Sequence, residues 1–238
     1  MFRLLQASVF IYLVIVFKGS INVMAGYDDT NDREVGIEWI EDYSPAYGDL
    51  EWTKEEAEGF YNRLGEKGWI KKFNYGDSSA WESDFENAFV NGYDDYYIDA
   101  FDFAYFPGHG SLDYFRFSTD HDGEVFNRRA WPVFHGLHAI LGFDTPLHDQ
   151  PIWIIPGIWW ESPGKVFVNY MTIQRYTIGE SWYRTTIEWQ PSDVYGAALA
   201  VYYNDTYGGQ YNDHLPGYGY VSPDVDNPDV LVYWRWQC

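Results

Sequence analysis

The single cysteine of this 238-residue chain is its last residue, Cys238, and this is the strongest constraint on its fold. One cysteine cannot form a disulfide within the chain, so a packed core has to stabilise the folded protein. Large rings are abundant, with 12 Trp, 22 Tyr and 16 Phe. Because each buried ring removes a large area from water, these residues are sufficient for the core of one sizeable domain.

The first 25 residues have the three-part pattern of a signal peptide. Arg3 gives a positive start, and an almost wholly apolar run follows at residues 7–17. Val23 and Ala25 stand at the small-residue positions before a cut ahead of Gly26. The run is shorter than the roughly 20 residues that a helix needs to span a membrane.

We therefore predict a signal peptide over residues 1–25 and a single α/β domain over residues 26–238. An exported protein, extracellular or at the cell surface, follows from this, with no stable membrane span after cleavage. The alternative is an uncleaved N-terminal anchor, because Lys18 is oddly placed directly after the apolar run.

The formal net charge of −21 limits the partners of the chain. Such a charge repels nucleic acid and anionic membrane surfaces, so neither is expected as a partner. It is compatible with a divalent cation, with a cationic partner or with a peptide or protein ligand. A solvated acidic surface is the simpler explanation of the charge.

Apolar runs alternate with helical patterns along the chain. Strands are expected at residues 35–40, 69–75, 98–106, 138–143, 197–203 and 230–236. Helices are expected from Thr53, as a side-chain cap, to about Gly65, and over residues 166–182. This alternation predicts an α/β sandwich with a mostly parallel sheet.

His109 is the strongest local candidate for chemistry. The buried run at residues 98–106 ends in Pro-Gly, and the order Gly108-His109-Gly110-Ser111 follows. Open α/β sheets place their sites at the carboxyl ends of strands, where this imidazole is expected. Flanking glycines allow a tight turn, and an imidazole acts as a general base near neutral pH. A turn histidine packed against a neighbour is the alternative.

Five segments resemble a prokaryotic family of mostly exported proteins that is classed as a domain of unknown function. They are GFYNRLGEKGW, FNYGDSSAWESDF, DFAYFPGHGS, FHGLHAILGF and NDHLPGYGYVSPD, and the resemblance runs from about Val35 to Trp236. That family is distantly similar to caspase- and gingipain-like cysteine peptidases, in which one strand ends in His-Gly and a second ends in the catalytic cysteine. The resemblance implies a caspase-like three-layer α/β/α sandwich and makes His109 the counterpart of the catalytic histidine.

The second strand and its cysteine have no counterpart in this sequence. After Ser111 the chain continues with FRFSTDHDGEVFNRRAW and reaches, at Trp131, the segment that should follow the nucleophile. We therefore predict a sheet with one strand missing and a peptidase-like protein that is catalytically inactive and acts in binding. The alternative is an active hydrolase, either metal-assisted or a cysteine peptidase whose nucleophile segment is lost from this sequence.

Asp120, His121 and Asp122 form the candidate metal site. A carboxylate–imidazole–carboxylate cluster can hold a divalent cation together with further oxygen or nitrogen ligands. A polar loop explains the same residues more simply, and no other cofactor is expected.

Other histidines match known motifs less well. His135 and His138 lie three residues apart, whereas a zinc-binding pair on a helix has its histidines four apart. His138 can equally begin a strand. Asp213 next to His214 offers a carboxylate beside an imidazole, but the Gly-rich surroundings indicate a loop.

The leader gives a direct prediction. Protein collected after export should begin at Gly26, because the residues before it satisfy the small-residue pattern of a cleavage site. N-terminal sequencing together with the intact mass checks this. A mass that still includes residues 1–25 would favour the anchor instead.

Overall fold

The computed structural model places the apolar runs of the sequence in one sheet and the amphipathic runs in helices that cover it. The residues that the structure describes are 9–10, 13–17, 32–43, 48–86, 92–97, 101–110, 116–118, 137–145, 161–202, 209–223, 225 and 230–238.

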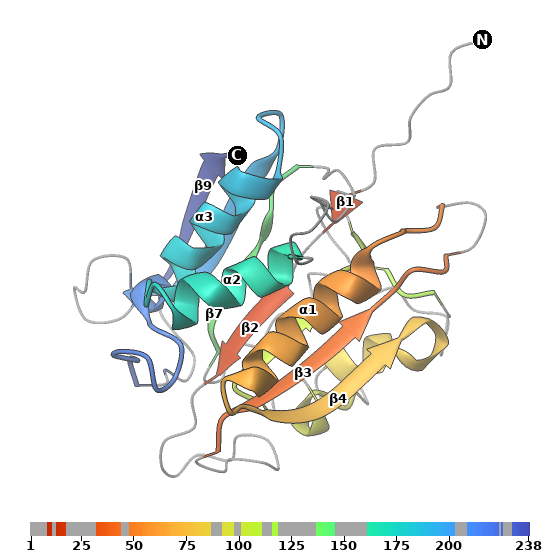
Figure 1. Ribbon diagram of the computed structural model, residues 1–238, viewed down its shortest axis with the longest axis horizontal. Helices are drawn as coiled ribbons and strands as arrows, with labels where there is room; N and C mark the ends of the chain where they lie inside the picture. The colour runs from red at the N-terminus through yellow and green to blue at the C-terminus, as the bar shows by residue number, and fades with distance from the viewer. Residues whose placement is uncertain are drawn as a thin grey trace.

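A mixed sheet of seven strands forms the centre of the described structure, in the order β4-β3-β5-β2-β7-β8-β9 (Figure 1). Its strands are β2 (Leu13–Phe17), β3 (Glu34–Trp39), β4 (Ile70–Gly76), β5 (Phe103–Phe106), β7 (Leu137–Phe143), β8 (Tyr195–Val201) and β9 (Leu231–Gln237). A separate two-residue ladder joins β1 (Val9–Phe10) to β6 (His109–Gly110).

The mixed α/β class is confirmed, but the mostly parallel sheet is wrong for the described strands. Only β4, β3 and β5 are parallel neighbours. β2 runs antiparallel to both β5 and β7, and β8 runs antiparallel to both β7 and β9. The sheet is mixed because β2 lies between β5 and β7 and runs opposite to both. The strand that follows α3, β8, also runs opposite to its neighbour β7.

The helices α1 (Thr53–Glu66), α2 (Pro163–Thr172) and α3 (Ile178–Trp189) pack side by side over one face of the sheet (Figure 1). α1 contacts β3, β4 and β5, and α2 lies between α1 and α3. No helix in the described part of the chain is both long and apolar enough to cross a membrane.

Two details of the expected helices are corrected by the structure. Thr53 does not cap α1; its hydroxyl donates instead to the carbonyl of Ile40 at 2.8 Å, which ties the start of the helix to the end of β3. The continuous helix expected over residues 166–182 is two helices. Arg175 has a left-handed φ of 57°, and the Thr177 hydroxyl accepts from the Glu180 amide to begin α3.

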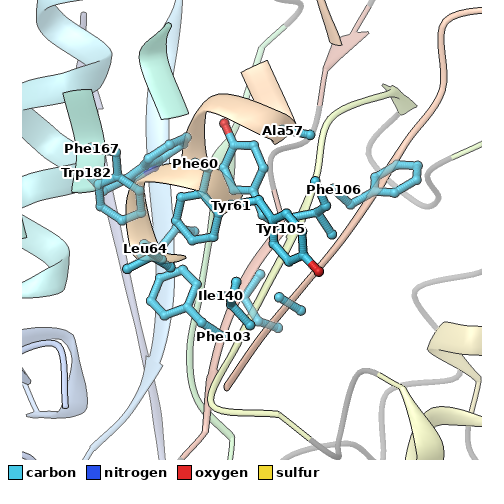
Figure 2. Close-up of a cluster of buried hydrophobic side chains, with 14 of the residues drawn as sticks. Ala57, Phe60, Tyr61, Leu64, Phe103, Tyr105, Phe106, Ile140, Phe167 and Trp182 are labelled. Atoms are coloured by element: carbon cyan, nitrogen blue, oxygen red, sulfur yellow. The ribbon is translucent and has the colours of Figure 1, made fainter. Parts of the chain in front are cut away.

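Phe60 on α1 is the centre of the aromatic core between the helices and the sheet (Figure 2). Its ring centroid lies 5.1 Å from that of Phe103 and 4.7 Å from that of Tyr105, both on β5. Phe167 on α2 is 6.2 Å from Phe60 and 5.5 Å from Trp182 on α3. One continuous set of rings therefore joins all three helices to the central strands.

On the other face of the sheet, the short turn η2 (Glu82–Phe85) packs against the end of β5 and contacts η4 (Asp94–Tyr96). Phe85 packs edge-on against Phe106 at the end of β5, with ring centroids 5.5 Å apart, and against Phe117 at 5.6 Å. This face has no helix of α1–α3 length among the described residues.

The strand β2 comes from the apolar run that predicts the leader. Its sequence LVIVF is rich in β-branched residues, which suit a buried strand as well as the apolar part of a signal peptide. Cleavage ahead of Gly26, and with it the domain boundary, stays a prediction.

The aromatic core predicts the cost of one truncation. Phe60→Ala should lower the free energy of unfolding by about 3–5 kcal/mol, because it leaves a cavity between α1 and β5. Urea unfolding followed by fluorescence measures this change. The control Ile187→Ala alters an exposed side chain of α3 and should stay within about 0.5 kcal/mol of the parent. An equal loss in both variants would contradict the central place of Phe60.

Candidate functional site

His109 lies directly beyond the carboxyl end of β5, as the sequence predicted. All four residues of β5 are buried, and Pro107 and Gly108 lead the chain into β6. A Cβ atom on Gly108 would lie 2.8 Å from the Phe106 ring and 2.8 Å from the Tyr43 hydroxyl oxygen. Glycine is therefore needed at this position so that the turn can pass between these two rings.

Backbone and side-chain hydrogen bonds hold His109 in place. Its backbone amide donates to the Tyr43 hydroxyl oxygen at 2.8 Å, and that hydroxyl donates to the carbonyl of Arg116 at 2.8 Å. The Arg116 amide donates back to the His109 carbonyl at 2.7 Å. The Tyr43 ring also packs against the imidazole, with centroids 4.3 Å apart.

The imidazole itself is engaged by the backbone. Nε2 of His109 lies 2.8 Å from the carbonyl oxygen of Gly48. A carbonyl only accepts, so Nε2 carries the hydrogen and Nδ1 is the basic nitrogen of the neutral ring. The side chain is buried, with 7% of the residue exposed. Burial lowers the pKa of the His109 imidazole and Arg116 lowers it further, against the opposing effects of the Gly48 carbonyl and Asp49.

Carboxylates surround this end of the sheet. Asp77 accepts from the backbone amides of Glu41 and Asp42 at 2.8 and 2.9 Å, and Asp49 accepts from the Tyr43 amide at 3.0 Å. Burial, together with the negative charges of Glu55 and Asp77, raises the pKa of Glu41 to about 7. The backbone that supports His109 is therefore held by acidic side chains, which make its surroundings strongly negative.

No thiol lies near this imidazole. Cys238 follows β9, whereas His109 follows β5, and the strands β2, β7 and β8 lie between them. At the usual spacing of sheet strands this separates the two positions by roughly 19 Å. Burial raises the pKa of the Cys238 thiol, although hydrogen bonds from Thr186 and the Gly196 backbone oppose this. A raised pKa lowers the share of thiolate, which is the reactive form.

Several predicted site residues lie outside the described part of the chain. They are Ser111, Asp120, His121, Asp122 and His135. Gly110 is the second residue of β6, paired with Val9 of β1. Within the described ranges, no group of three or more histidine, cysteine, aspartate or glutamate side chains is arranged to hold a metal ion.

A second polar network joins residues that the sequence analysis considered separately. Nδ1 of His138, near the start of β7, lies 2.7 Å from Oδ2 of Asp213. The other carboxylate oxygen of Asp213 accepts from the Ser222 amide at 2.9 Å and from its hydroxyl at 2.7 Å. His138 is completely buried, and Asp213 and Ser222 are each 2% exposed.

This network stabilises the fold rather than presenting a nucleophile. The Ser222 hydroxyl donates to the carboxylate of Asp213 and not to the imidazole, so the three groups lack the order of a catalytic triad. The Asp213 carbonyl also accepts from the Ile178 amide at the start of α3, at 2.7 Å. His138 therefore ties β7 to the C-terminal part of the chain. Sequence reasoning missed it because its partners are 75 positions apart.

The two histidine sites lie at opposite ends of the sheet. Phe106, just before His109, is level with Leu13 at one end of β2. Leu137, just before His138, is level with Phe17 at the other end. They cannot combine into one site.

Fold and site together define a mixed α/β protein with a buried histidine at the carboxyl end of a central strand. A family profile described as Domain of unknown function (DUF6345) matches residues 37–130 and 122–238, so the chain belongs to this family. The uncharacterised family expected from the sequence is thereby confirmed. No curated protein and no solved structure matches the chain.

The hydrogen bonds of His109 predict its titration. Its pKa in the folded protein should lie below the ordinary value of 6.5, because burial disfavours the charged ring. A histidine that the folded state keeps neutral stabilises it above about pH 6.5, and this contribution is lost as the pH falls and the unfolded chain takes up the proton. NMR titration of the imidazole measures the pKa directly.

His109→Gln is the matched variant for this titration. Glutamine can keep a donor toward the Gly48 carbonyl but cannot titrate. The variant should therefore lose less stability than the parent between about pH 7 and pH 5. A pKa above 6.5 in the parent would show that the ring is not held in the neutral form.

Proposed function

We propose that this protein is an exported binding protein of peptidase-like descent that performs no thiol chemistry. The observation that carries the proposal is the hydrogen bond from Nε2 of His109 to the Gly48 carbonyl. In a cysteine peptidase the imidazole has to face the thiol and accept its proton. Here one ring nitrogen serves the backbone, and the Tyr43 ring covers the imidazole.

The position of Cys238 supports the same proposal. Three strands separate β9 from β5, and the pKa of the thiol is raised rather than lowered. A thiolate nucleophile needs a nearby histidine or another positive influence. Neither a histidine nor a positive charge is among the leading influences on the pKa of the Cys238 thiol.

The sequence between Ser111 and Trp131 is the basis for proposing a missing block. The two matched segments of the family profile overlap within it, at residues 122–130. This is where the resemblance to caspase- and gingipain-like peptidases predicts a strand that ends in cysteine. We propose that the chain derives from a caspase-like three-layer α/β/α fold that lacks this strand.

A peptide or protein ligand is the proposed partner. The carboxylates of Asp42, Asp49 and Asp77 lie on the segments that support His109. Their charge, added to the net charge of −21, favours a lysine- or arginine-containing ligand over an acidic one.

An active hydrolase is the second candidate, favoured by the buried imidazole of His109 just beyond the carboxyl end of β5. If the gene encodes a nucleophile segment that this sequence lacks, the complete protein would be a cysteine peptidase. A metal-assisted reaction through Asp120, His121 and Asp122 is the other form of this candidate.

The proposal predicts the reactivity of the purified protein. Peptidyl probes that carry a thiol-reactive group should label Cys238 slowly, and His109→Ala should not change the rate, because the ring and the thiol do not meet. Mass spectrometry of the labelled peptide measures both rates, and Cys238→Ser is the blank. Labelling that disappears in His109→Ala would overturn the proposal.

Two further measurements separate the candidates. A basic peptide should bind the parent protein more tightly than an acidic peptide of equal length, with an affinity that falls as salt is added. Bound divalent metal, together with a hydrolytic activity that a chelator abolishes, would establish the metal-assisted hydrolase. Recovery of a cysteine codon on resequencing codons 111–131 would establish the peptidase.

A further inference from the structure

Four buried carboxyl groups belong to β3 and to the turns η2 and η4. Glu38 projects from β3 and is 1% exposed; Glu82 and Asp84 belong to η2 and are 0% and 2% exposed. Asp94 of η4, which contacts η2, is 1% exposed. None of these residues takes part in the site around His109.

Glu38 has the most unusual surroundings of the four. Both of its carboxylate oxygens are buried, and neither makes a hydrogen bond of good geometry. Its side chain lies against that of Asp84, and burial and Asp84 raise the pKa of Glu38 well above its ordinary value, while the Trp81 amide opposes the shift. The leading charged influences on Glu38 are both carboxylates, Asp84 and Glu82.

No positively charged side chain is among the leading influences on the pKa of Glu38. Tyr75 on β4 is level with Glu38 in the sheet, and Tyr97 follows η4. The pKa of Tyr97 is itself raised by burial and by the charges of Asp84 and Glu38. Glu38 therefore faces two acids on η2, a phenol on β4 and a phenol beyond η4.

Two ionised carboxylates cannot be buried side by side without a large cost in free energy. Either a cation or a proton has to remove one charge. The described residues offer no set of three metal-ligating side chains, so a proton is the simpler solution. A protonated carboxyl group also supplies the donor that the Glu38–Asp84 contact otherwise lacks.

We propose that Glu38 is protonated at neutral pH and donates a hydrogen bond to Asp84, so that the pair holds η2 on β3 in acidic and neutral solution and releases it in alkaline solution. The proposal is independent of the function proposed above. Its consequence is local, because Phe85 of η2 covers the end of β5. Loss of the proton would loosen this cover and expose Phe106 and Phe117.

The direction of the pH dependence follows from the raised pKa. Between the pKa of glutamate in the unfolded chain and that of Glu38 in the fold, only the unfolded chain loses its proton. The stabilisation is therefore complete at acidic pH and falls as the pH rises through this window.

Glu38→Gln tests the proposal, because the amide keeps the shape and the donor of the protonated acid and cannot ionise. At about pH 8.5 the variant should unfold at a temperature about 3–8 °C above the parent, and near pH 5 the two should differ little. Glu66→Gln on α1 is the control, since that exposed carboxylate should give no such pH-dependent gain. Hydrogen exchange of residues 77–86 should quicken with pH in the parent beyond its intrinsic rise, and not in Glu38→Gln.

Infrared difference spectra between the parent and Glu38→Gln give a readout that does not depend on stability. At neutral pH the parent should show the carbonyl stretch of one protonated carboxylic acid. The proposal would be overturned if this band is absent and the unfolding temperatures of the parent and of Glu38→Gln change with pH in the same way. If Ca²⁺ or Mg²⁺ stabilises the parent and not Glu38→Gln, the pair binds a cation instead, and the shared proton is equally disproved.

Discussion

The packing of α1 on the parallel strands β3 and β5 is the interaction on which the rest of the structure depends. Phe60 contacts Phe103 and Tyr105, and these two are level with Val35 and Ile37 of β3. This contact fixes where both strands end, and the segments after those ends carry Tyr43, Gly48 and His109. The position of the imidazole thus depends on packing at the helical face of the sheet, where the Tyr105 hydroxyl also donates to Glu56 of α1 at 2.8 Å.

The strands and the main site could be read from the sequence because both are local patterns. Apolar runs predicted β3, β4, β7 and β9 to within about two residues. The Pro-Gly break after β5 predicted the place of His109. Strand direction could not be predicted in the same way, because it depends on which distant segments become neighbours. The two-helix form of residues 163–189 was missed since its break depends on the backbone of Arg175, a residue type that tolerates a helix.

The polar networks show the limit of reading residues one at a time. His138 and Asp213 each attracted notice in the sequence, but neither has a neighbour in the chain that indicates the other. The sequence did not single out Glu38 as a site residue. A glutamate in an alternating strand such as β3 is typical of a face exposed to solvent. The burial of Glu38 depends on η2 and η4, whose short sequences ESDF and DDY contain the Ser and Asp typical of turns on a surface. Partners far apart in the chain become visible only once the sheet has brought them together.

The end of β9 has a practical consequence for the chemistry of the lone cysteine. A lone cysteine there would ordinarily link two chains through a disulfide. Cys238 is partly buried, its amide donates to the Val194 carbonyl at 3.0 Å, and the pKa of its thiol is raised. Exchange with other thiols requires an accessible thiolate, so this arrangement slows covalent dimerisation through Cys238.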